Sequence, residues 1–410
     1  LKICNSIFMK ILDTYLFKDT DLVILAGGKG SRIKEFLGKF PKPMLKFNNK
    51  HFIQYIMNAS SKYNFRRIII LCGYRHKIFF DKFHGKKINL TEILCLREKK
   101  LLGTSGALSN LKKLKVKNFV LINGDTIFNI NLNSLISSLK KNQIGCVALA
   151  KNKNQKSQKL NSLYLKKNII SLKKNSPYMN GGVYFFKKEI FKYISKKNHS
   201  LENDLLPKLI HKKKIGGKIF KDFFIDIGSK YYFNIAEKKL KNEFNRPAVF
   251  LDRDGVINYD YGYVHKIDKF KFRTGVIDGL KYLVKKNYYI FIITNQAGIG
   301  KGKFTERSFV KLHKIINEKL KKLNIFINDV KYSPFHPKAI IKKYKKNSLM
   351  RKPGNKMIEN IRLNWDIDIK NSFMIGDKTT DMLAAKKSKI KFFYAKSNFY
   401  QQIKSVINSY

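Results

Sequence analysis

The sequence has few cysteines, few acidic residues and no long apolar run. Its four cysteines are Cys4, Cys72, Cys95 and Cys146. All lie in the first half without paired or metal-type spacing, which excludes a disulfide scaffold and favours reduced thiols in the cytoplasm. No apolar run approaches a membrane span in length, so we expect no membrane partner. Charges interrupt the mildly apolar residues 1–17 and no cleavage site follows, so we interpret residues 1–19 as an irregular extension.

Acidic residues are far outnumbered by basic ones. The chain has 28 Asp and Glu against 85 Lys and Arg, and its formal net charge is +57. Such a charge indicates nucleic-acid binding only beside a suitable motif, and the sequence has no zinc finger, recognition helix or arginine cluster. Lysine is spread along the whole chain with abundant Asn, Ile, Tyr and Phe, a pattern typical of an AT-rich genome. We therefore expect no nucleic-acid partner, but small phosphorylated substrates, which the charge would attract.

The length of 410 residues and the alternation of strands with helices predict two α/β domains. Apolar strand-like runs occur at residues 22–26, 68–72, 119–123, 147–150, 248–251, 289–294 and 373–376. Longer amphipathic stretches separate them, so we expect mostly parallel sheets with helices on both faces. A charged helical stretch ends at Asn245-Arg246-Pro247 and marks a boundary. The predicted parts are a first domain at 20–240, a linker at 241–247 and a second domain at 248–410.

A glycine-rich turn follows the first strand. Residues 22–32 read Leu-Val-Ile-Leu-Ala-Gly-Gly-Lys-Gly-Ser-Arg. Glycines in such a turn let backbone N–H groups approach phosphate oxygens. A second glycine turn follows at residues 103–106, where small side chains leave room for a flat base. The expected nucleotide-binding residues are Ala26, Gly27, Gly28, Gly30, Ser31, Gly103, Thr104 and Gly106, with the cations Arg32 and Lys42 beside them.

Acidic residues stand at the ends of two later strands of this half. Asp125 follows the run at 119–123, and Asp226 ends Phe224-Ile225-Asp226. Carboxylate oxygens suit Mg²⁺, a hard cation that also binds nucleotide phosphates. Asn180, just before an expected strand, and Glu202, at a capped helix start, are further polar candidates.

In order and spacing, these motifs over residues 20–237 resemble the sugar-phosphate nucleotidyltransferases, and among them the guanylyltransferases that act on a heptose 1-phosphate. The resemblance implies a Rossmann-like, GT-A-like domain in which a sugar 1-phosphate attacks the α-phosphorus of a nucleoside triphosphate. Catalysis would then depend on positioning and charge neutralisation. By this resemblance, Arg32 would bind the triphosphate and Lys42 the reacting phosphates. Asn180 and Glu202 would bind the sugar, and Asp125 and Asp226 would bind Mg²⁺.

Residues 248–255, Ala-Val-Phe-Leu-Asp-Arg-Asp-Gly, place two carboxylates directly after an apolar strand. Ligands of open α/β sheets bind at the carboxyl ends of the strands. Asp252 and Asp254 would therefore project into a crevice, where one carboxylate can attack phosphorus while the other handles a proton. Further polar groups follow later in the chain: Thr294, Asn295, Gln296, Arg351, Lys352, Asp377 and Asp381.

This second series resembles the haloacid-dehalogenase-like phosphatases, which implies a Rossmannoid domain with little or no cap. The resemblance implies an aspartyl-phosphate on Asp252 and an acid and base role for Asp254. The other implied roles are the phosphoryl clamp for Thr294 and Lys352, substrate binding for Asn295, Gln296 and Arg351, and Mg²⁺ binding for Asp252, the carbonyl of Asp254 and Asp377, with support from Asp381.

Two further motifs narrow the resemblance to the D,D-heptose 1,7-bisphosphate 7-phosphatases, over residues 247–395. They are Gly262-Tyr263-Val264-His265 and Gly300-Lys301-Gly302-Lys303-Phe304-Thr305. Those phosphatases usually hold a structural zinc with Cys-x-His and Cys-x-Cys, whereas the matching positions here are Ser333, Phe335, Ser348 and Met350. Zinc needs about four nitrogen or sulfur ligands. We therefore expect no structural zinc and a loop held by packing instead.

The two halves fit consecutive reactions. The second would remove the 7-phosphate of D-glycero-D-manno-heptose 1,7-bisphosphate, and the first would transfer a nucleotidyl group, expected to be guanylyl, to the resulting heptose 1-phosphate. One alternative is a nucleotidyltransferase for another sugar 1-phosphate fused to a histidinol-phosphatase-like enzyme. Another is a basic nucleic-acid-binding protein with degenerate enzyme folds, against which the intact acidic residues argue. The oligomeric state stays open.

Overall fold

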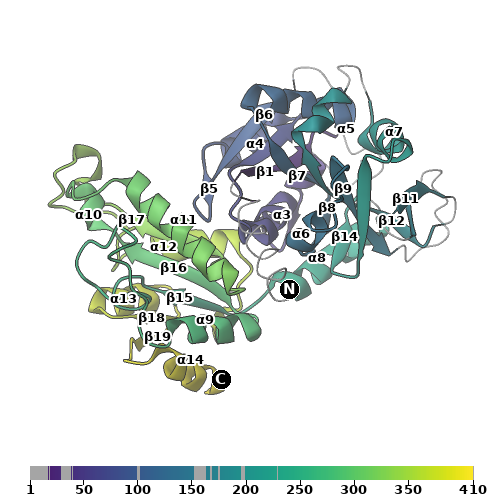
Figure 1. Ribbon diagram of the computed structural model, residues 1–410. Helices are drawn as coiled ribbons and strands as arrows, with labels where there is room; N and C mark the ends of the chain where they lie inside the picture. Colours follow the sequence, from purple (N-terminus) through teal and green to yellow (C-terminus); the bar gives the residue numbers. More distant parts are fainter. Residues whose placement is uncertain are drawn as a thin grey trace. The chain divides into compact units, whose positions relative to one another are not determined.

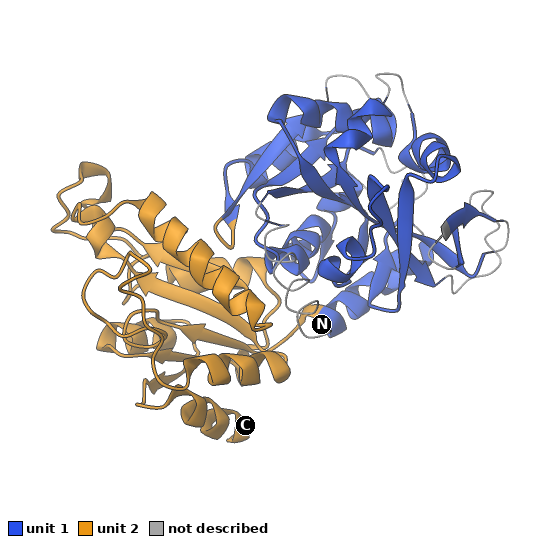
Figure 2. Ribbon diagram, viewed as in Figure 1, with its two compact units in different colours: residues 1–87, 91–243 blue, residues 88–90, 244–410 orange. Residues whose placement is uncertain are grey.

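The computed structural model describes residues 17, 19–28, 38, 40–98, 102–151, 163–166, 169–173, 176–194, 199–228 and 230–409. The chain divides into two compact units (Figure 2): unit 1 contains residues 1–87 and 91–243, and unit 2 contains residues 88–90 and 244–410. Both have an α/β architecture, which confirms the predicted fold class. Within the described ranges, no helix combines the length and apolar character needed to cross a membrane.

Unit 1 is built on an eight-stranded sheet in the order β13-β9-β12-β7-β1-β4-β6-β5. Its strands are β1 (Thr20–Ala26), β4 (Ile68–Cys72), β5 (Lys87–Ile88), β6 (Thr91–Arg97), β7 (Asn118–Asn123), β9 (Gly145–Lys151), β12 (Tyr178–Lys187) and β13 (Ile215–Phe220). Strands β1, β5, β6, β7, β9 and β12 of this sheet are labelled in Figure 1. Strand β12 runs antiparallel to β7 and β9, while β1 pairs in parallel with β4 and β7. Short ribbons are formed by β2 (Lys46–Phe47) with β3 (Lys50–His51), β8 (Thr126–Phe128) with β14 (Phe224–Asp226), and β10 (Leu163–Lys166) with β11 (Ile169–Leu172).

The helices of unit 1 connect these strands. They are α3 (Phe52–Ser61), α4 (His76–Phe83), α5 (Gly103–Gly106), α6 (Leu132–Ile136), α7 (Leu206–His211) and α8 (Lys230–Phe244). Tighter or wider turns are η2 (Lys42–Met44), η3 (Ala107–Leu114), η4 (Lys188–Lys192) and η5 (Leu201–Leu205).

The central strands of unit 1 form because their side chains are apolar on both faces. Every residue of β4, Ile-Ile-Ile-Leu-Cys, is buried, as expected of a parallel strand that is covered on both sides. Ile24 of β1 lies between Ile70 of β4 and Ile122 of β7. Since β1 and β7 are parallel neighbours, the polar residues that follow them meet at one edge of the sheet.

The β8–β14 ribbon brings a further acid to this edge. Its register pairs Thr126 with Asp226 and Phe128 with Phe224. Because side chains alternate along a strand, Phe224 and Asp226 lie on the same face of β14. The backbone N–H of Ile227 donates to the carbonyl of Asp125 at 3.0 Å, so the end of the ribbon is fastened beside the end of β7.

Unit 2 contains a five-stranded, fully parallel sheet in the order β17-β16-β15-β18-β19. Its strands are β15 (Ala248–Leu251), β16 (Tyr289–Asn295), β17 (Asp329–Ser333), β18 (Phe373–Gly376) and β19 (Lys391–Tyr394). Its helices are α9 (Val276–Lys285), α10 (Ala297–Gly300), α11 (Glu306–Lys322), α12 (Lys356–Asn364), α13 (Thr379–Lys387) and α14 (Phe399–Asn408), with the turns η6 (Lys342–Tyr344) and η7 (Ile369–Asn371). Val249 and Leu251 pack in one apolar cluster and Ala248 and Phe250 in another, so β15 is buried on both faces.

Three local features differ from the sequence-based expectations. Helix α8 continues to Phe244, so residues 241–244 of the expected linker are helical. Asn180 lies inside β12 rather than before it, and the pairing with β9 shifts register between Asn180 and Tyr184. Gly182, at φ +68°, allows the strand to bend here without ending. Phe17, in the expected extension, is buried against the rings of Tyr63 and Phe65.

Candidate active sites

Lys42, Asp125 and Asp226 converge at one point in unit 1. Lys42 Nζ lies 3.1 Å from Asp125 Oδ2. A methyl group built on Gly228 would lie 2.8 Å from Asp226 Oδ1, 3.2 Å from Lys42 Nζ and 3.3 Å from Asp125 Oδ2. Glycine therefore keeps the space between the three charged groups open, and its N–H orients Asp226 through a 2.8 Å hydrogen bond. Two carboxylates and an ammonium around such a space can hold a divalent cation and a phosphate.

The prolines around Lys42 explain its position. Pro41 and Pro43 restrict the backbone, and the turn is closed by hydrogen bonds from Met44 N to the Pro41 carbonyl and from Leu45 N to the Lys42 carbonyl. Lys42 is only 8% exposed, so its stem is buried while its ammonium reaches Asp125.

The glycine turn after β1 is described only in part. A methyl group on Gly27 would lie 2.7 Å from Glu98 Oε1, whereas one on Gly28 would have no neighbour within 4 Å. Glycine at 27 thus allows the Glu98 carboxylate to approach the turn. Gly30, Ser31 and Arg32, for which we expected nucleotide contacts, lie outside the described residues.

Glu98 is a candidate residue that our sequence reasoning missed. It directly follows β6, and burial raises the pKa of its carboxyl to about 7. The signal that selected Asp125 and Asp226, an acid at the end of a strand, would also have found it.

The Glu202 carboxylate accepts hydrogen bonds from four side chains. Thr104 Oγ1 and Ser200 Oγ donate to Oε2 at 3.2 and 3.3 Å. Asn123 Nδ2 and the Tyr184 hydroxyl donate to Oε1 at 3.3 and 3.5 Å. Thr104 also accepts from the backbone N–H of Leu201 at 2.7 Å. Thr104, which we expected to bind nucleotide, thus holds Glu202. Through these hydrogen bonds Thr104 joins the second glycine turn to the start of η5.

Tyr184 links Asn180 to Glu202. Asn180 Nδ2 donates to the Tyr184 hydroxyl at 2.6 Å, and Asn180 Oδ1 accepts from Gly182 N at 3.0 Å. Tyr184 is fully buried, and burial raises the pKa of its hydroxyl. The structure thereby brings together the two expected sugar ligands. Tyr184 itself stands in an apolar strand, where the sequence pattern indicates only a core residue.

In unit 2, Lys352 lies between two aspartates at the carboxyl end of the sheet. Its Nζ is 2.8 Å from Asp252 Oδ1 and 2.5 Å from Asp381 Oδ1, and it donates to the Ile293 carbonyl at 3.0 Å. All three charged side chains are almost completely buried. Burial raises the pKa of Asp252 to about 7, although Lys352 acts in the opposite direction.

Three carboxylates around Lys352 could hold a metal ion. Ligand oxygens of Asp252, Asp377 and Asp381 lie within 4.8 Å of one another. Asp377 Oδ1 is buried and accepts no hydrogen bond from any residue in the described part of the chain. A hard cation such as Mg²⁺ would satisfy this oxygen, so the donor set fits the expected metal.

The side chain of Asp254 is held apart from this cluster. Arg253 Nη2 donates to both Asp254 oxygens at 2.8 Å. Asn258 Nδ2 donates to Oδ1 at 3.0 Å, and Gln296 Nε2 donates to Oδ2 at 2.9 Å. Arg253 is completely buried and lies over the Phe309 ring, 5.6 Å from its centroid. Our sequence reasoning gave Arg253 no role, although a cation between two acids is itself a signal for an ion pair.

The remaining candidates divide into residues that position other side chains and, within the described part of the chain, one residue with an unpaired donor. Gln296 Nε2 also donates to Thr294 Oγ1 at 2.9 Å, and the Asn295 amide makes two 3.0 Å hydrogen bonds with the backbone of Lys352. Asn295 and Gln296, expected to bind substrate, therefore hold other candidate residues in this structure. Arg351 differs, because its buried Nη1 has no acceptor among the described residues, which suits a group that binds an anion.

The two narrower motifs of unit 2 contact each other near Asp254. The ring of His265 stacks on Phe304 with centroids 4.8 Å apart, and Lys301 Nζ lies 3.4 Å from the Tyr263 hydroxyl. The carbonyl of Val264 accepts from Arg253 Nη2 at 2.7 Å. The motif at 262–265 is thus hydrogen-bonded to Arg253, which in turn holds Asp254.

The segment that contains Ser333, Phe335, Ser348 and Met350, for which we expected packing in place of zinc, is packed by side chains. Phe335 contacts the Tyr344 ring edge to face at 6.0 Å, and Lys346 Nζ lies 4.8 Å from the Phe335 centroid. Met350 packs against the apolar cluster on one face of β15, and its sulfur accepts from Asn360 Nδ2 at 3.4 Å.

Comparison with known proteins identifies the class of each half. Residues 22–243, more than half of the chain, match the Nucleotidyl transferase family, and the chain belongs to this family. Residues 252–405 match the Polynucleotide kinase 3 phosphatase family. The solved structure of HddC from Yersinia pseudotuberculosis is 27% identical, covers 54% of this chain and 100% of that chain, and has a TM-score of 0.45.

Curated relatives of the second half define the phosphatase more narrowly. The D-glycero-beta-D-manno-heptose-1,7-bisphosphate 7-phosphatase of Photorhabdus laumondii is 44% identical over 144 residues, which are 35% of this chain and 77% of the relative. The enzyme of the same name from Escherichia coli strain K12 is 42% identical over 139 residues, 34% of this chain and 73% of the relative. Through its second half, the chain also belongs to this phosphatase family.

We predict that the purified protein carries no stoichiometric zinc. Ser333, Phe335, Ser348 and Met350 offer no thiolate or imidazole, and zinc needs about four such ligands. Metal analysis by mass spectrometry after mild dialysis should give far less than one zinc per chain. As a matched control, the combined variant Ser333→Cys, Phe335→His, Ser348→Cys and Met350→Cys should bind about one zinc. One zinc on the unmodified chain would contradict the prediction.

Proposed function

We propose that unit 2 removes the 7-phosphate of D-glycero-D-manno-heptose 1,7-bisphosphate and that unit 1 transfers a guanylyl group to the heptose 1-phosphate that results. The observation that carries the proposal is the buried Lys352 ammonium between Asp252 and Asp381, at the end of the strands of a domain related to heptose bisphosphate phosphatases. The product of this half is the substrate class that the other half would use. The phosphorylated sugars and the nucleoside triphosphate would be met in the cytoplasm.

In the phosphatase reaction, Asp252 would act as the nucleophile. Its carboxylate oxygen attacks the phosphorus, the bond to the sugar oxygen breaks, and Asp254 gives a proton to that leaving oxygen. Asp254 then takes a proton from water, whose oxygen attacks the phosphorus and releases phosphate and free Asp252. Lys352 and Thr294 would bind the phosphoryl oxygens throughout. Asp252, Asp377 and the Asp254 carbonyl would hold Mg²⁺, with Asp381 in support, and the bound cation would neutralise negative charge.

In the transferase reaction, an oxygen of heptose 1-phosphate would attack the α-phosphorus of GTP. The bond to the oxygen that bridges the α- and β-phosphates breaks, and pyrophosphate leaves. Lys42 would hold the reacting phosphates, while Glu202 and Asn180, joined through Tyr184, would orient the sugar hydroxyls. Asp125 and Asp226 would hold Mg²⁺, which supplies charge neutralisation when bound.

We infer that Glu98 recognises the guanine base of the nucleotide by hydrogen bonding. Guanine presents two adjacent donors, N1–H and N2–H, to which one carboxylate can accept two hydrogen bonds. Glu98 lies beside the glycine turn at Gly27, where an acid facing the triphosphate would be repelled and one facing guanine would be paired. Adenine has an acceptor at its N1 position, so it would leave this half-buried carboxylate poorly paired.

The two activities should separate by mutation. Asp252→Asn retains the side-chain shape but removes the nucleophile, so phosphate release should fall by about 10³-fold or more while transfer from heptose 1-phosphate changes less than about twofold. Asp125→Asn should lower transfer by about 10²-fold and leave phosphate release unchanged. Coupled assays for phosphate and pyrophosphate measure both.

The exposed residues Asp278 in α9 and Asp81 in α4 provide matched controls. Asp278→Asn and Asp81→Asn remove the same charge from each unit and should leave both activities intact. If Asp252→Asn or Asp125→Asn abolishes both activities in a folded protein, the two-site proposal is wrong.

Base preference should depend on Glu98. We expect kcat/KM for GTP to exceed that for ATP by about 10-fold or more, and Glu98→Gln to remove most of this preference. Because the Glu98 carboxyl ionises as pH rises through about 7, the preference should increase from pH 6 to pH 8 in the unmodified chain and stay flat in the variant. Glu92→Gln, at an exposed position of the same strand, is the control. Equal rates with GTP and ATP would remove the guanylyl assignment, and an unchanged preference in Glu98→Gln would remove the role of Glu98.

A further inference from the structure

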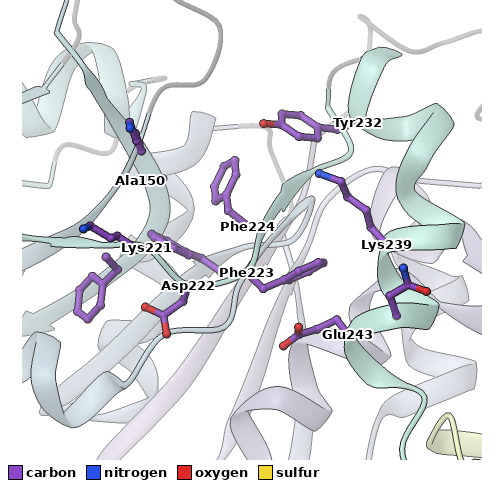
Figure 3. A pocket seen from close by; sticks show the side chains of 12 residues that line it. Ala150, Lys221, Asp222, Phe223, Phe224, Tyr232, Lys239 and Glu243 are labelled. Carbon is purple, nitrogen blue, oxygen red and sulfur yellow. The ribbon is translucent and has the colours of Figure 1, made fainter.

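Unit 1 contains a pocket of about 390 Å³ to which neither proposed reaction assigns a role. Its lining residues are Phe128, Ala150, Lys151, Phe220, Lys221, Asp222, Phe223, Phe224, Tyr232, Lys239, Asn242 and Glu243. They come from β8, β9, the segment from β13 to β14, and α8. Figure 3 shows Tyr232, Lys239 and Glu243 on α8, facing the chain segment that carries Phe224. The volume lies within the range of small-molecule sites.

Aromatic rings form one wall of this pocket. Phe128 packs edge to face against Phe224 and Phe220, with centroids 5.3 and 6.1 Å apart. Phe224 in turn packs edge to face against Tyr232 at 6.1 Å. A wall of adjoining rings is suited to a flat, aromatic ligand group, because stacking on aromatic side chains is favourable for every nucleobase.

Charged groups surround the rings. The lining has three lysines, and Lys239 Nζ lies 5.3 Å from the Tyr232 centroid. Two acids, Asp222 and Glu243, also line the pocket, and Glu243 Oε1 is oriented by a 2.8 Å hydrogen bond from Asn129. Ammonium groups next to rings suit phosphates attached to an aromatic base, and carboxylates suit the hydroxyls of a ribose.

We propose that this pocket is a second nucleoside-phosphate site, with the base on the aromatic wall, the phosphates toward the lysines and the ribose toward the acids. It is distinct from the transfer site, because none of Lys42, Asp125, Asp226 and Gly228 lines the pocket. The ligand has the chemistry of a nucleoside diphosphate, which a free nucleotide and a sugar nucleotide share.

The test counts binding sites on the full chain by isothermal titration calorimetry. The probes are GDP, GDP-mannose and inorganic pyrophosphate. We expect two GDP molecules per chain, one at the transfer site and one in the pocket. Pyrophosphate should bind the second site at least about 10-fold more weakly than GDP, because it has no base to stack. If GDP binds more tightly than GDP-mannose, the ligand of the pocket is a free nucleotide. If GDP-mannose binds more tightly, the ligand is a sugar nucleotide.

Replacing a lysine of the pocket with glutamate tests whether the second GDP molecule binds there. Lys239→Glu should weaken the second binding event by about 10-fold or more, while Lys238→Glu, an exposed neighbour on α8 outside the pocket, should keep two sites. Lys221→Glu, at an exposed position in the pocket lining, should repeat the effect if Lys239→Glu misfolds. One GDP per unmodified chain whose binding Lys239→Glu leaves unchanged, equal losses in the Lys238 and Lys239 variants, or pyrophosphate binding as tight as that of GDP would each overturn the proposal. One GDP whose binding Lys239→Glu weakens would retain the pocket and count against GDP binding at the transfer site.

Discussion

A lysine ammonium enclosed by aspartates at the edge of a parallel sheet constrains the whole of unit 2. Burying these charges is costly unless they are paired and hydrogen-bonded. Lys352 meets this condition through Asp252, Asp381 and the Ile293 carbonyl. The pairing requires β15, β16 and β18 to end at one level. Their uninterrupted apolar sequences achieve this by burying both faces of the sheet.

Unit 1 also pairs a lysine with an aspartate at the end of its sheet, but these side chains are less buried than those of unit 2. Its lysine pairs with Asp125 at the end of β7, while the β8–β14 ribbon brings Asp226 from much later in the chain. The space between them depends on a residue without a side chain, Gly228. In both units the charged groups sit where strands stop, because only there can side chains leave the sheet without displacing its apolar core.

Much of the fold and the acidic residues of both sites could be predicted from sequence, because each acid follows an apolar run of strand length. Asp252 and Asp125 are found in this way. Tyr184 was missed because its role depends on contacts with Asn180 and Glu202 that an apolar strand pattern does not indicate. Arg253 and Glu98 do have local signals, a cation between two acids and an acid directly after a strand, but only the folded structure shows what they contact. The sequence also misled at Asn180, which we expected just before a strand, because Gly182 allows β12 to begin at Tyr178 and bend after Asn180.

The short connection between α8 and β15 has a consequence for the amounts in which the two catalytic units are made. Three residues separate the end of the helix at Phe244 from the start of the strand at Ala248, and both units are translated as one polypeptide. A cell therefore makes the two proposed catalysts in equal numbers, and no difference in expression can change their ratio. Whether heptose 1-phosphate accumulates is then determined by the relative turnover of the two sites, by the nucleotide pool and by any competing consumer of the intermediate.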